Sequence, residues 1–265
     1  MSLVAAVDWH ILWQRIFQPD RVFFDALLRT IYISVAAQFF GVLLGLLAAL
    51  MRMSKFWPAR ALSALYVLLF RGTPVIVQIF FVYFGANLLF GFDLFPREVG
   101  WLGGLNGAVF AGIVALAVNE GAYMREIIRA GIDAIDKGQM EAARSLGMTH
   151  RLAMRRIVLP QAARVIVPPL GNEFNNMMKT TSLLFFIGVY EIFGDADVHY
   201  STTFKPVEYF AAVAFWYLVL TTIWSVVQAQ IERKLSVSER GEEPSFRERL
   251  AQAWSPVQAW GRGAR

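Results

Sequence analysis

Residues 136–160 of the chain read DKGQMEAARSLGMTHRLAMRRIVLP and predict a short helix that ends in a tight turn. Asp136 can cap the first turn of this helix, and Gln139 stands three residues later, which is the spacing of a reciprocal capping pair. Gly147 can adopt the left-handed backbone conformation in which many helices end. We therefore expect this helix to stop in a sharp bend at Gly147.

The second half of the same stretch predicts another short helix. Thr149 can cap its first turn, and the helix is expected to run to Leu159, where Pro160 ends it. In the first helix, Ala142 and Ala143 leave a low-profile surface that a groove on another protein could fit closely. Two rigid helices held at a fixed angle would form a lever. The competing interpretation is an ordinary amphipathic connector between larger elements.

On either side of this stretch the chain is too apolar for a soluble fold. Hydrophobic residues make up 57% of the 265 residues, and the mean hydropathy is +0.47. A bilayer core of ~30 Å requires ~20 mostly apolar residues in a helix. Five stretches meet or approach this requirement: 27–50, 60–90, 107–130, 165–193 and 207–231. The sequence therefore predicts an all-α integral membrane protein with a bundle of five transmembrane helices.

Two of these spans contain helix-breaking residues. The second span is long enough to hold a break at Gly72 and Pro74, and the fourth is expected to start at Pro168 and Pro169. Irregular backbone at membrane depth must be buried against protein, because lipid offers no hydrogen-bond partner. Both irregular segments are therefore expected to pack against other helices.

The distribution of basic residues predicts the orientation in the membrane, because short loops rich in Lys and Arg stay on the cytoplasmic side. The loop between the first two spans carries Arg52, Lys55 and Arg60. The loop between the third and fourth spans carries Arg129, Lys137, Arg144, Arg151, Arg155, Arg156 and Arg164. Both loops are expected in the cytoplasm, which places the N-terminus outside and the C-terminus inside.

The same patterns divide the chain into three segments. Residues 1–26 form an N-terminal segment with an interfacial amphipathic helix, residues 27–235 hold the five spans and a cytoplasmic loop at 133–160, and residues 236–265 form a charged cytoplasmic tail. The apolar residues of the amphipathic helix are Trp9, Leu12, Trp13, Ile16 and Phe17. The tail is expected to be either a surface helix or disordered.

Several kinds of chemistry are excluded or not expected. The chain has no cysteine, which excludes disulfides, thiolate metal sites and cysteine nucleophiles. His10, His150 and His199 fall on opposite sides of the predicted membrane, so no metal site is expected. The formal net charge of +5 follows the membrane topology, with no basic groove that would indicate nucleic-acid binding. No set of nucleophile, base and orienting residue stands out as a catalytic site.

The stretch at 136–160 resembles the EAA loop of ABC importer permeases. That pattern is EAA, three residues, Gly, nine residues and I-x-L-P, and every position of it is met in a loop that the charge distribution places in the cytoplasm. Over almost the whole of 27–235 the chain is also similar to the polar amino acid permeases. The matching segments are RGTP at 71–74 with Gln78, REIIRAG at 125–131, GQ at 138–139, PLGNEF at 169–174 and KTTSL at 179–183.

This resemblance implies a type I ABC importer permease-like bundle in the prokaryotic cell membrane, without catalysis of its own. The chain has no glycine–lysine phosphate loop, so ATP and Mg would be bound by a cytoplasmic ATPase dimer, and no cofactor by this chain. The other implied partners are a second permease subunit, identical or homologous, an extracytoplasmic solute-binding protein and membrane lipid. The implied ATPase-coupling residues are Gly138, Glu141, Ala142, Ala143, Gly147, Ile157, Leu159 and Pro160.

Charges within the spans need a partner or a function, because each costs at least ~2.5–3.5 kcal/mol at the membrane centre. The ionisable residues concerned are Arg71, Glu120, Arg125, Glu126 and Lys179. Arg71 is expected near mid-membrane, where it could bind the carboxylate of an amino acid, or alternatively join two helices by a salt bridge. The candidate solute path consists of Arg71, Thr73, Gln78, Asn175, Lys179, Thr181 and Ser182. Glu126 and Arg129, one helical turn apart, form a candidate structural pair.

The leading interpretation is the permease subunit of an ATP-driven importer for polar amino acids or amino-acid-like solutes. An ion-coupled secondary amino acid carrier is the alternative, and a membrane enzyme acting on lipids is more distant. The EAA spacing separates them, because neither alternative needs a cytoplasmic docking helix. The sequence leaves open which amino acid is moved and whether the permease pairs with itself.

Overall fold

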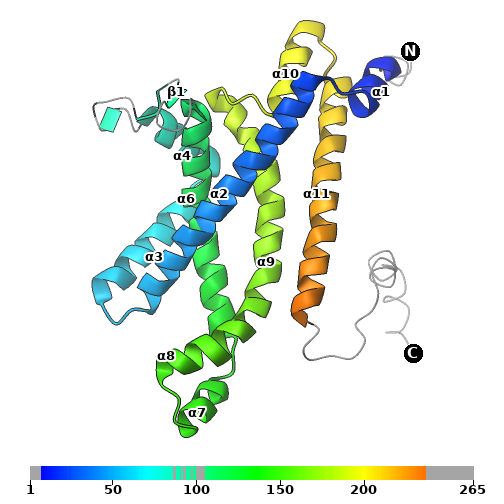
Figure 1. Ribbon diagram of the computed structural model, residues 1–265. Coiled ribbons are helices and arrows are strands. Elements are labelled where there is room, and N and C mark those ends of the chain that lie inside the picture. Colours follow the sequence, from blue (N-terminus) through cyan, green and yellow to red (C-terminus); the bar gives the residue numbers. More distant parts are fainter. Residues whose placement is uncertain are drawn as a thin grey trace, which may run out of the picture.

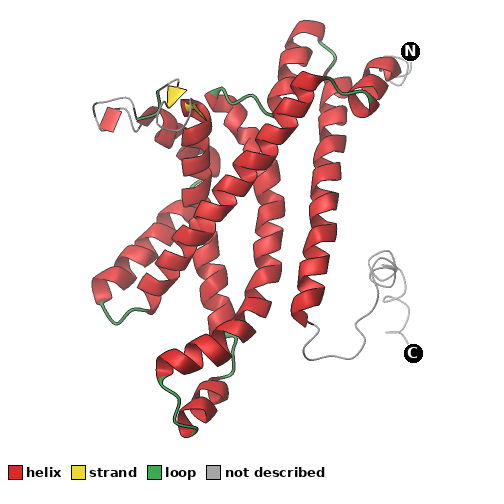
Figure 2. Cartoon of the chain, in the orientation of Figure 1, coloured by secondary structure: helices red, strands yellow, loops and turns green. Residues whose placement is uncertain are grey.

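The computed structural model of the protein describes residues 7–85, 88, 89, 91, 94–96, 98, 99 and 105–236. Within this part the chain is helical apart from one short ribbon, in which strand β1 (Glu98–Val99) pairs antiparallel with β2 (Leu105–Asn106). Figure 2 shows how far helices dominate. The predicted all-α class is confirmed. The structure describes no residue after Ser236, so the rest of the predicted tail, 237–265, lies outside the described residues.

Among the described residues, three helices are long and apolar enough to cross a membrane: α2 (Arg21–Met53), α6 (Gly107–Asp133) and α11 (Pro206–Ser236). In Figure 1, α2 crosses α6 at an angle and α11 stands along one side of the bundle. Gly45 of α2 lies directly against α6, where an added Cβ would clash with Met124. Such small residues let membrane helices pack closely through their backbones.

The second predicted span is a bent pair of helices. α3 (Trp57–Gly72) and α4 (Val75–Phe80), which a π turn extends to Gly85, meet at an angle of 108°. Pro74 lacks an N–H group and holds Thr73 in an extended conformation (φ −122°, ψ 148°), so α3 cannot continue. The predicted break is confirmed.

Side chains satisfy the backbone at this break. The amide nitrogen Nε2 of Gln78 donates to the carbonyl oxygens of Phe70 (2.9 Å) and Thr73 (3.0 Å). Asn119 of α6 donates to the same Phe70 oxygen through Nδ2 (3.1 Å). Carbonyl groups released by a broken helix at membrane depth need such partners. The break is therefore a built feature, packed against α6 as expected.

Helix α9 (Leu159–Thr180) contradicts one expectation. It holds Pro168 and Pro169 in its interior instead of starting at them, and a 3-10 turn (Thr181–Ile187) follows it. The two prolines remove the hydrogen bonds to the carbonyl groups of residues 164 and 165, and α11 packs against the helix in this region, where Nε2 of Gln228 donates to the carbonyl oxygen of Pro168 at 3.1 Å. Neighbouring helices commonly stabilise proline-containing membrane helices in this way.

The polarity of α9 sets it apart from the other long helices. It contacts both α6 and α11 and runs through the bundle, yet it is not among the helices that are apolar enough to cross a membrane by composition. The bent α3–α4 pair would make a fourth span, and α9 is the fifth predicted one. Polar side chains at this depth face protein or water rather than lipid. The polar face of α9 therefore points to an internal site.

The two ends of the bundle differ in structure. Helices α1 (Trp9–Phe17) and α10 (Ile192–Thr203) lie at one end, and the loop helices α7 (Lys137–Ser145) and α8 (His150–Ala153) lie at the other (Figure 1). The Nζ atom of Lys205 donates to Oδ2 of Asp8 at 2.7 Å, and this hydrogen bond lowers the pKa of the Asp8 carboxyl. The exposed aromatic residues of α1 are Trp9, Trp13 and Phe17. This arrangement suits the predicted interfacial helix, which the charged contact fixes to the start of α11.

Candidate functional site: a polar cavity and a protruding loop

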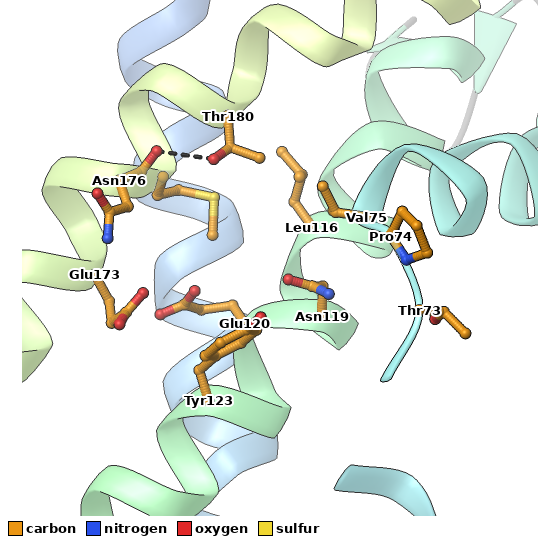
Figure 3. Close-up of a pocket in the computed structure, with 11 residues that line it drawn as sticks. Thr73, Pro74, Val75, Leu116, Asn119, Glu120, Tyr123, Glu173, Asn176 and Thr180 are labelled. Carbon is orange, nitrogen blue, oxygen red and sulfur yellow. Dashed lines mark hydrogen bonds between the residues drawn. The ribbon is translucent and has the colours of Figure 1, made fainter. Parts of the chain in front are cut away.

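A cavity of about 370 Å³ lies where the α3–α4 break meets α6 and α9. Figure 3 shows its lining side chains converging from these three sides. The lining residues are Thr73, Pro74, Val75, Leu116, Asn119, Glu120, Tyr123, Glu173, Asn176, Met177 and Thr180. The proline that breaks the second span thus opens one wall of the cavity, and the polar face of α9 forms another.

Two carboxylates give the cavity its charge. Glu120 of α6 is only 4% exposed, and Glu173 of α9 is half-buried. In Figure 3 they lie on the same side of the cavity, and they are close enough to interact electrostatically. In the part of the chain that the structure describes, neither carboxylate has a Lys or Arg within ion-pair distance, and the lining contains no cation. The cavity therefore contains two carboxyl groups that have no cationic partner among the described residues.

The neutral polar lining residues fall into two groups. The Asn119 amide is held in place, because Nδ2 donates to Oε1 of Gln78 (2.9 Å) as well as to the α3–α4 break. The Thr180 hydroxyl donates to the backbone carbonyl oxygen of Asn176 at 2.9 Å. The Asn176 amide and the Tyr123 hydroxyl, in contrast, make no side-chain hydrogen bond to any described residue. One amide and one phenol are therefore available to a bound molecule.

Of the predicted solute path, Thr73 lines this cavity and Arg71 lies beside it. The Cζ atom of Arg71 sits 5.1 Å from the ring centroid of Tyr123, a cation–π contact with a lining residue. Among the described residues, Arg71 forms no salt bridge with another helix, which was the alternative role. Its guanidinium therefore remains available at the edge of the cavity.

The other predicted path residues are not brought together there. Gln78 is fixed to the α3–α4 break, and Thr181 is fully buried, donating to the carbonyl oxygen of Met178 at 2.8 Å. Lys179 and Ser182 line a separate hollow of about 530 Å³ against α10 and α11. The candidate solute path is therefore corrected, because Arg71, Asn175 and Lys179 do not share one cavity in the described structure.

Helix geometry explains this correction. Residues three and four apart share a face of a helix. Glu173, Asn176 and Thr180 have that spacing and line the cavity. Asn175 and Lys179 also have it, but they lie on the neighbouring face of α9, and Lys179 lines the separate hollow. The Asn175 oxygen Oδ1 is buried without a hydrogen-bond partner in the described residues. Applied to α9, this spacing separates two polar faces but does not show which of them lines the cavity.

The predicted structural pair lies in the C-terminal part of α6, just after the residues that line the cavity. Nη2 of Arg129 lies 3.2 Å from Oε2 of Glu126, and Nη1 of Arg129 lies 2.6 Å from Oδ2 of Asp133. Arg125 also forms an ion pair with Glu126. Glu126 and Arg129 are therefore paired with each other within α6.

The loop at 133–160 forms α7 (Lys137–Ser145), α8 (His150–Ala153) and a π turn (Met154–Val158). Gly147 has φ +80°, and the amide of Met148 donates to the carbonyl oxygen of Ala143 at 3.0 Å. The backbone amide of Gly147 donates to the backbone carbonyl oxygen of Arg144 at 2.9 Å. These two bonds form the glycine-ended helix terminus that the sequence predicts.

Three details of the loop differ from expectation. Asp136 caps α7 by accepting from the Gly138 amide (2.8 Å), but Oε1 of Gln139 accepts from Gln161 instead of completing a reciprocal pair. Ala143 is buried, which leaves only Ala142 of the alanine pair exposed. Pro160 does not end a helix.

The π turn explains the position of Pro160. It leads the chain from α8 straight into α9, whose first turn contains Pro160. A proline is tolerated in the first turn of a helix, because no hydrogen bond from its nitrogen is needed there. Ile157 and Leu159 lie at the same junction, and Leu159 is 44% exposed. The loop and the wall of the cavity are therefore connected by continuous helix.

The outer surface of the loop is exposed. Glu141 and Ala142 of α7 are exposed, and Leu146 at its end is 82% exposed. Figure 1 shows α7 and α8 protruding beyond the ends of the long helices. The loop therefore presents an exposed surface beyond the ends of the long helices.

Comparison with known proteins places this arrangement in context. Residues 41–237 match the family described as binding-protein-dependent transport system inner membrane component. The chain is 38% identical over 244 residues to the arginine transport system permease protein ArgU of Corynebacterium glutamicum, covering 87% of this chain and 77% of that protein. It is 31% identical over 233 residues to the glutamine transport system permease protein GlnP of Escherichia coli, with coverages of 87% and 98%.

Solved structures show the same relationship. A crystal structure of an amino acid ABC transporter with histidines matches with a TM-score of 0.71 and 40% identity, over 80% of this chain and 94% of that one. The MetNI methionine ABC transporter in an inward-facing conformation matches with a TM-score of 0.66 at 18% identity, over 81% of this chain and 96% of that one. The second match shows a shared fold.

Proposed function

Because the chain belongs to the binding-protein-dependent transport system inner membrane components and is a permease subunit of an amino acid ABC importer, we propose that its cavity binds an amino acid with a positively charged side chain. The permease is an inner membrane component and the ion-coupled carrier does not hold as an alternative. The cavity then serves as the place where the solute rests on its way across the bilayer.

The charge of the cavity carries this proposal. Glu120 and Glu173 supply two negative charges and Arg71, at the edge, supplies one positive charge, so the formal sum is −2 + 1 = −1. Arginine and lysine have a net charge of +1. The carboxylate of such a solute can pair with the guanidinium of Arg71, and its cationic side chain can pair with Glu120 and Glu173. The cavity volume falls within the usual range for small-molecule sites. The printed name of the arginine permease ArgU agrees with this class of solute.

The protruding loop is proposed to couple the permease to its ATPase. α7 is exposed and ends in a sharp turn at Gly147, and α9 extends from the loop to the cavity. The family implies an ATPase and a solute-binding protein as partners. We assign ATP and Mg to two ATPase subunits, and we propose two permease subunits, identical or homologous. The coupling residues are Gly138, Glu141, Ala142, Ala143, Gly147, Ile157, Leu159 and Pro160.

Solute binding to the purified permease–ATPase complex, without the binding protein, tests the cavity directly. We expect arginine and lysine to bind more tightly than citrulline, which has the shape of arginine without its charge, and glutamate to bind weakest. Equilibrium binding of radiolabelled solutes gives the order. Equal affinity for arginine and citrulline would contradict the proposed cationic site.

Single cysteines test the proposed orientation, because the chain has none of its own. Thr203→Cys, exposed at the end of α10, is expected to react with an impermeant thiol reagent in intact cells. Lys137→Cys, exposed on α7, is expected to react only after the membrane is permeabilised. The measurement is the labelled fraction before and after permeabilisation. Labelling of Lys137→Cys in intact cells would reverse the assignment.

A further inference from the structure

The buried carboxylate of Glu120 has one hydrogen-bond donor among the described residues, and that donor lies outside the cavity. Nε2 of Gln38, on α2, donates to Oε1 of Glu120 at 3.0 Å. Gln38 is 7% exposed and does not line the cavity, whereas Glu120 does. Gln38, which a solute would not touch, therefore makes the one hydrogen bond that the described residues offer to the carboxylate of Glu120, which a solute would meet.

α2 also provides the space into which Glu120 fits. Gly41, three residues after Gln38 and on the same face of α2, lies against the stem of Glu120. A Cβ at Gly41 would come within 2.6 Å of Cγ of Glu120, so the side chain can lie there only because that position is glycine. The stem and one oxygen of Glu120 are thus both fixed by one face of α2.

The Gln38 amide is arranged to serve a carboxylate. Its nitrogen also approaches Sδ of Met124 at 3.8 Å, while its oxygen Oε1 is buried and has no hydrogen-bond partner in the part of the chain that the structure describes. If the amide were rotated by half a turn, its oxygen instead of its nitrogen would face the carboxylate of Glu120, and two acceptors would meet. Buried polar groups normally have partners, so the contact with Glu120 is the interaction that accounts for this amide.

We infer that Gln38 is a positioning residue that sets the preference of the cavity for a cationic solute, by holding the carboxylate of Glu120 in place. The inference rests on the proposed function of the cavity. An amide that donates to one carboxylate oxygen fixes the orientation of the carboxyl group. A carboxylate held on one side by an amide also presents a fixed negative charge to the other side, and a preorganised charge binds a cation better than a mobile one.

A four-member set of variants tests the inference: the unchanged chain, Gln38→Met, Glu120→Gln and the double variant. Methionine keeps the length of the side chain and removes the donor. In the purified permease–ATPase complex, Gln38→Met is expected to weaken arginine binding about tenfold, the usual effect of losing a hydrogen bond to a charged group, and to leave citrulline binding unchanged. In the Glu120→Gln background it is expected to have no further effect on arginine binding.

Two further variants separate positioning from packing. Gln228→Met is a matched control, because Gln228 is a buried amide of α11 that donates to Oε1 of Glu232 at 2.8 Å, away from the cavity lining. It is expected to lower the melting temperature without changing the arginine-to-citrulline ratio. Gln38→Asn keeps the amide and shortens its reach, and it is expected to lower arginine affinity selectively, which provides the test if Gln38→Met does not assemble.

The outcomes are distinct. An equal loss of arginine and citrulline binding, or a loss that persists undiminished in the Glu120→Gln background, would show a packing role and overturn the inference. If Glu120→Gln weakens arginine binding and neither Gln38 variant does, the inference is overturned and the proposed function stands. If Glu120→Gln itself changes nothing, the proposed function of the cavity fails and the inference fails with it.

Discussion

Replacement of Glu120 by Gln is expected to weaken arginine binding to the permease–ATPase complex about a hundredfold. The carboxylate is almost fully buried and has no cationic partner within the described residues, so a bound solute would supply that partner. Removing one member of a buried charge pair typically costs ~2–5 kcal/mol, and each 1.4 kcal/mol is about a factor of ten in affinity. The measurement is the equilibrium dissociation constant of radiolabelled arginine.

Citrulline provides the internal control for this variant, since it matches arginine in shape and lacks its charge. Its affinity is expected to stay unchanged in Glu120→Gln, so that the discrimination between the two solutes disappears. Glu208→Gln serves as the matched protein control. Glu208 is equally buried but accepts from the Asp8 amide at 2.7 Å at the start of α11, outside the cavity. Full arginine discrimination in Glu120→Gln would remove this residue from the site.

Replacement of Gly147 by Val is expected to reduce solute-stimulated ATP hydrolysis and transport about tenfold or more. Gly147 has φ +80°, and a β-branched residue there is strained by roughly 1–3 kcal/mol. An exposed loop can relieve that strain by changing the turn, which would move α7 relative to α8. Solute binding is expected to persist, because the turn lies at the opposite end of α9 from the cavity. Hydrolysis by the reconstituted importer, with and without solute, measures the loss.

Two variants isolate the role of this turn. Gly147→Asn is expected to retain most of the coupled activity, because asparagine tolerates the left-handed conformation far better than valine. Gly188→Val introduces the same kind of strain at φ +85°, after the 3-10 turn that follows α9, and at both glycines an added Cβ would meet no atom within 4 Å. It is expected to lower stability without abolishing stimulation. Normal coupled hydrolysis in Gly147→Val would contradict the coupling role.

Local chemistry made much of the fold predictable. The break at Pro74 and the left-handed end at Gly147 depend on the backbone properties of single residues, and the structure shows both. The prolines of α9 obey the same rules only in part, because they lie inside a helix that packs against α11. A contact between helices that are far apart in the sequence leaves no local signal at the proline itself.

The cavity was harder to predict for a related reason. The cost of charge in the membrane identified Glu120 and Arg71 as residues that need a function, but it did not show which faces of α6 and α9 meet. That depends on the close packing of α2 and α6 at Gly41 and Gly45 and on the direction of α4 after the break. Gln38 in particular gives no signal in the sequence, because one glutamine in an apolar span is equally compatible with a contact between helices.

Because α9 is continuous, it connects two binding sites: the loop, where the ATPase is proposed to bind, and the cavity, where the amino acid is proposed to bind. One end of this helix adjoins the loop through Pro160, and the other presents Glu173 and Asn176 to the cavity. If engagement of the ATPase at the loop changes the affinity of the cavity for its amino acid by some factor, then thermodynamic reciprocity requires the bound amino acid to change the affinity for the ATPase by the same factor. The solute is then an effector of the assembly that transports it, and an empty and a filled permease are two different binding partners for the same ATPase.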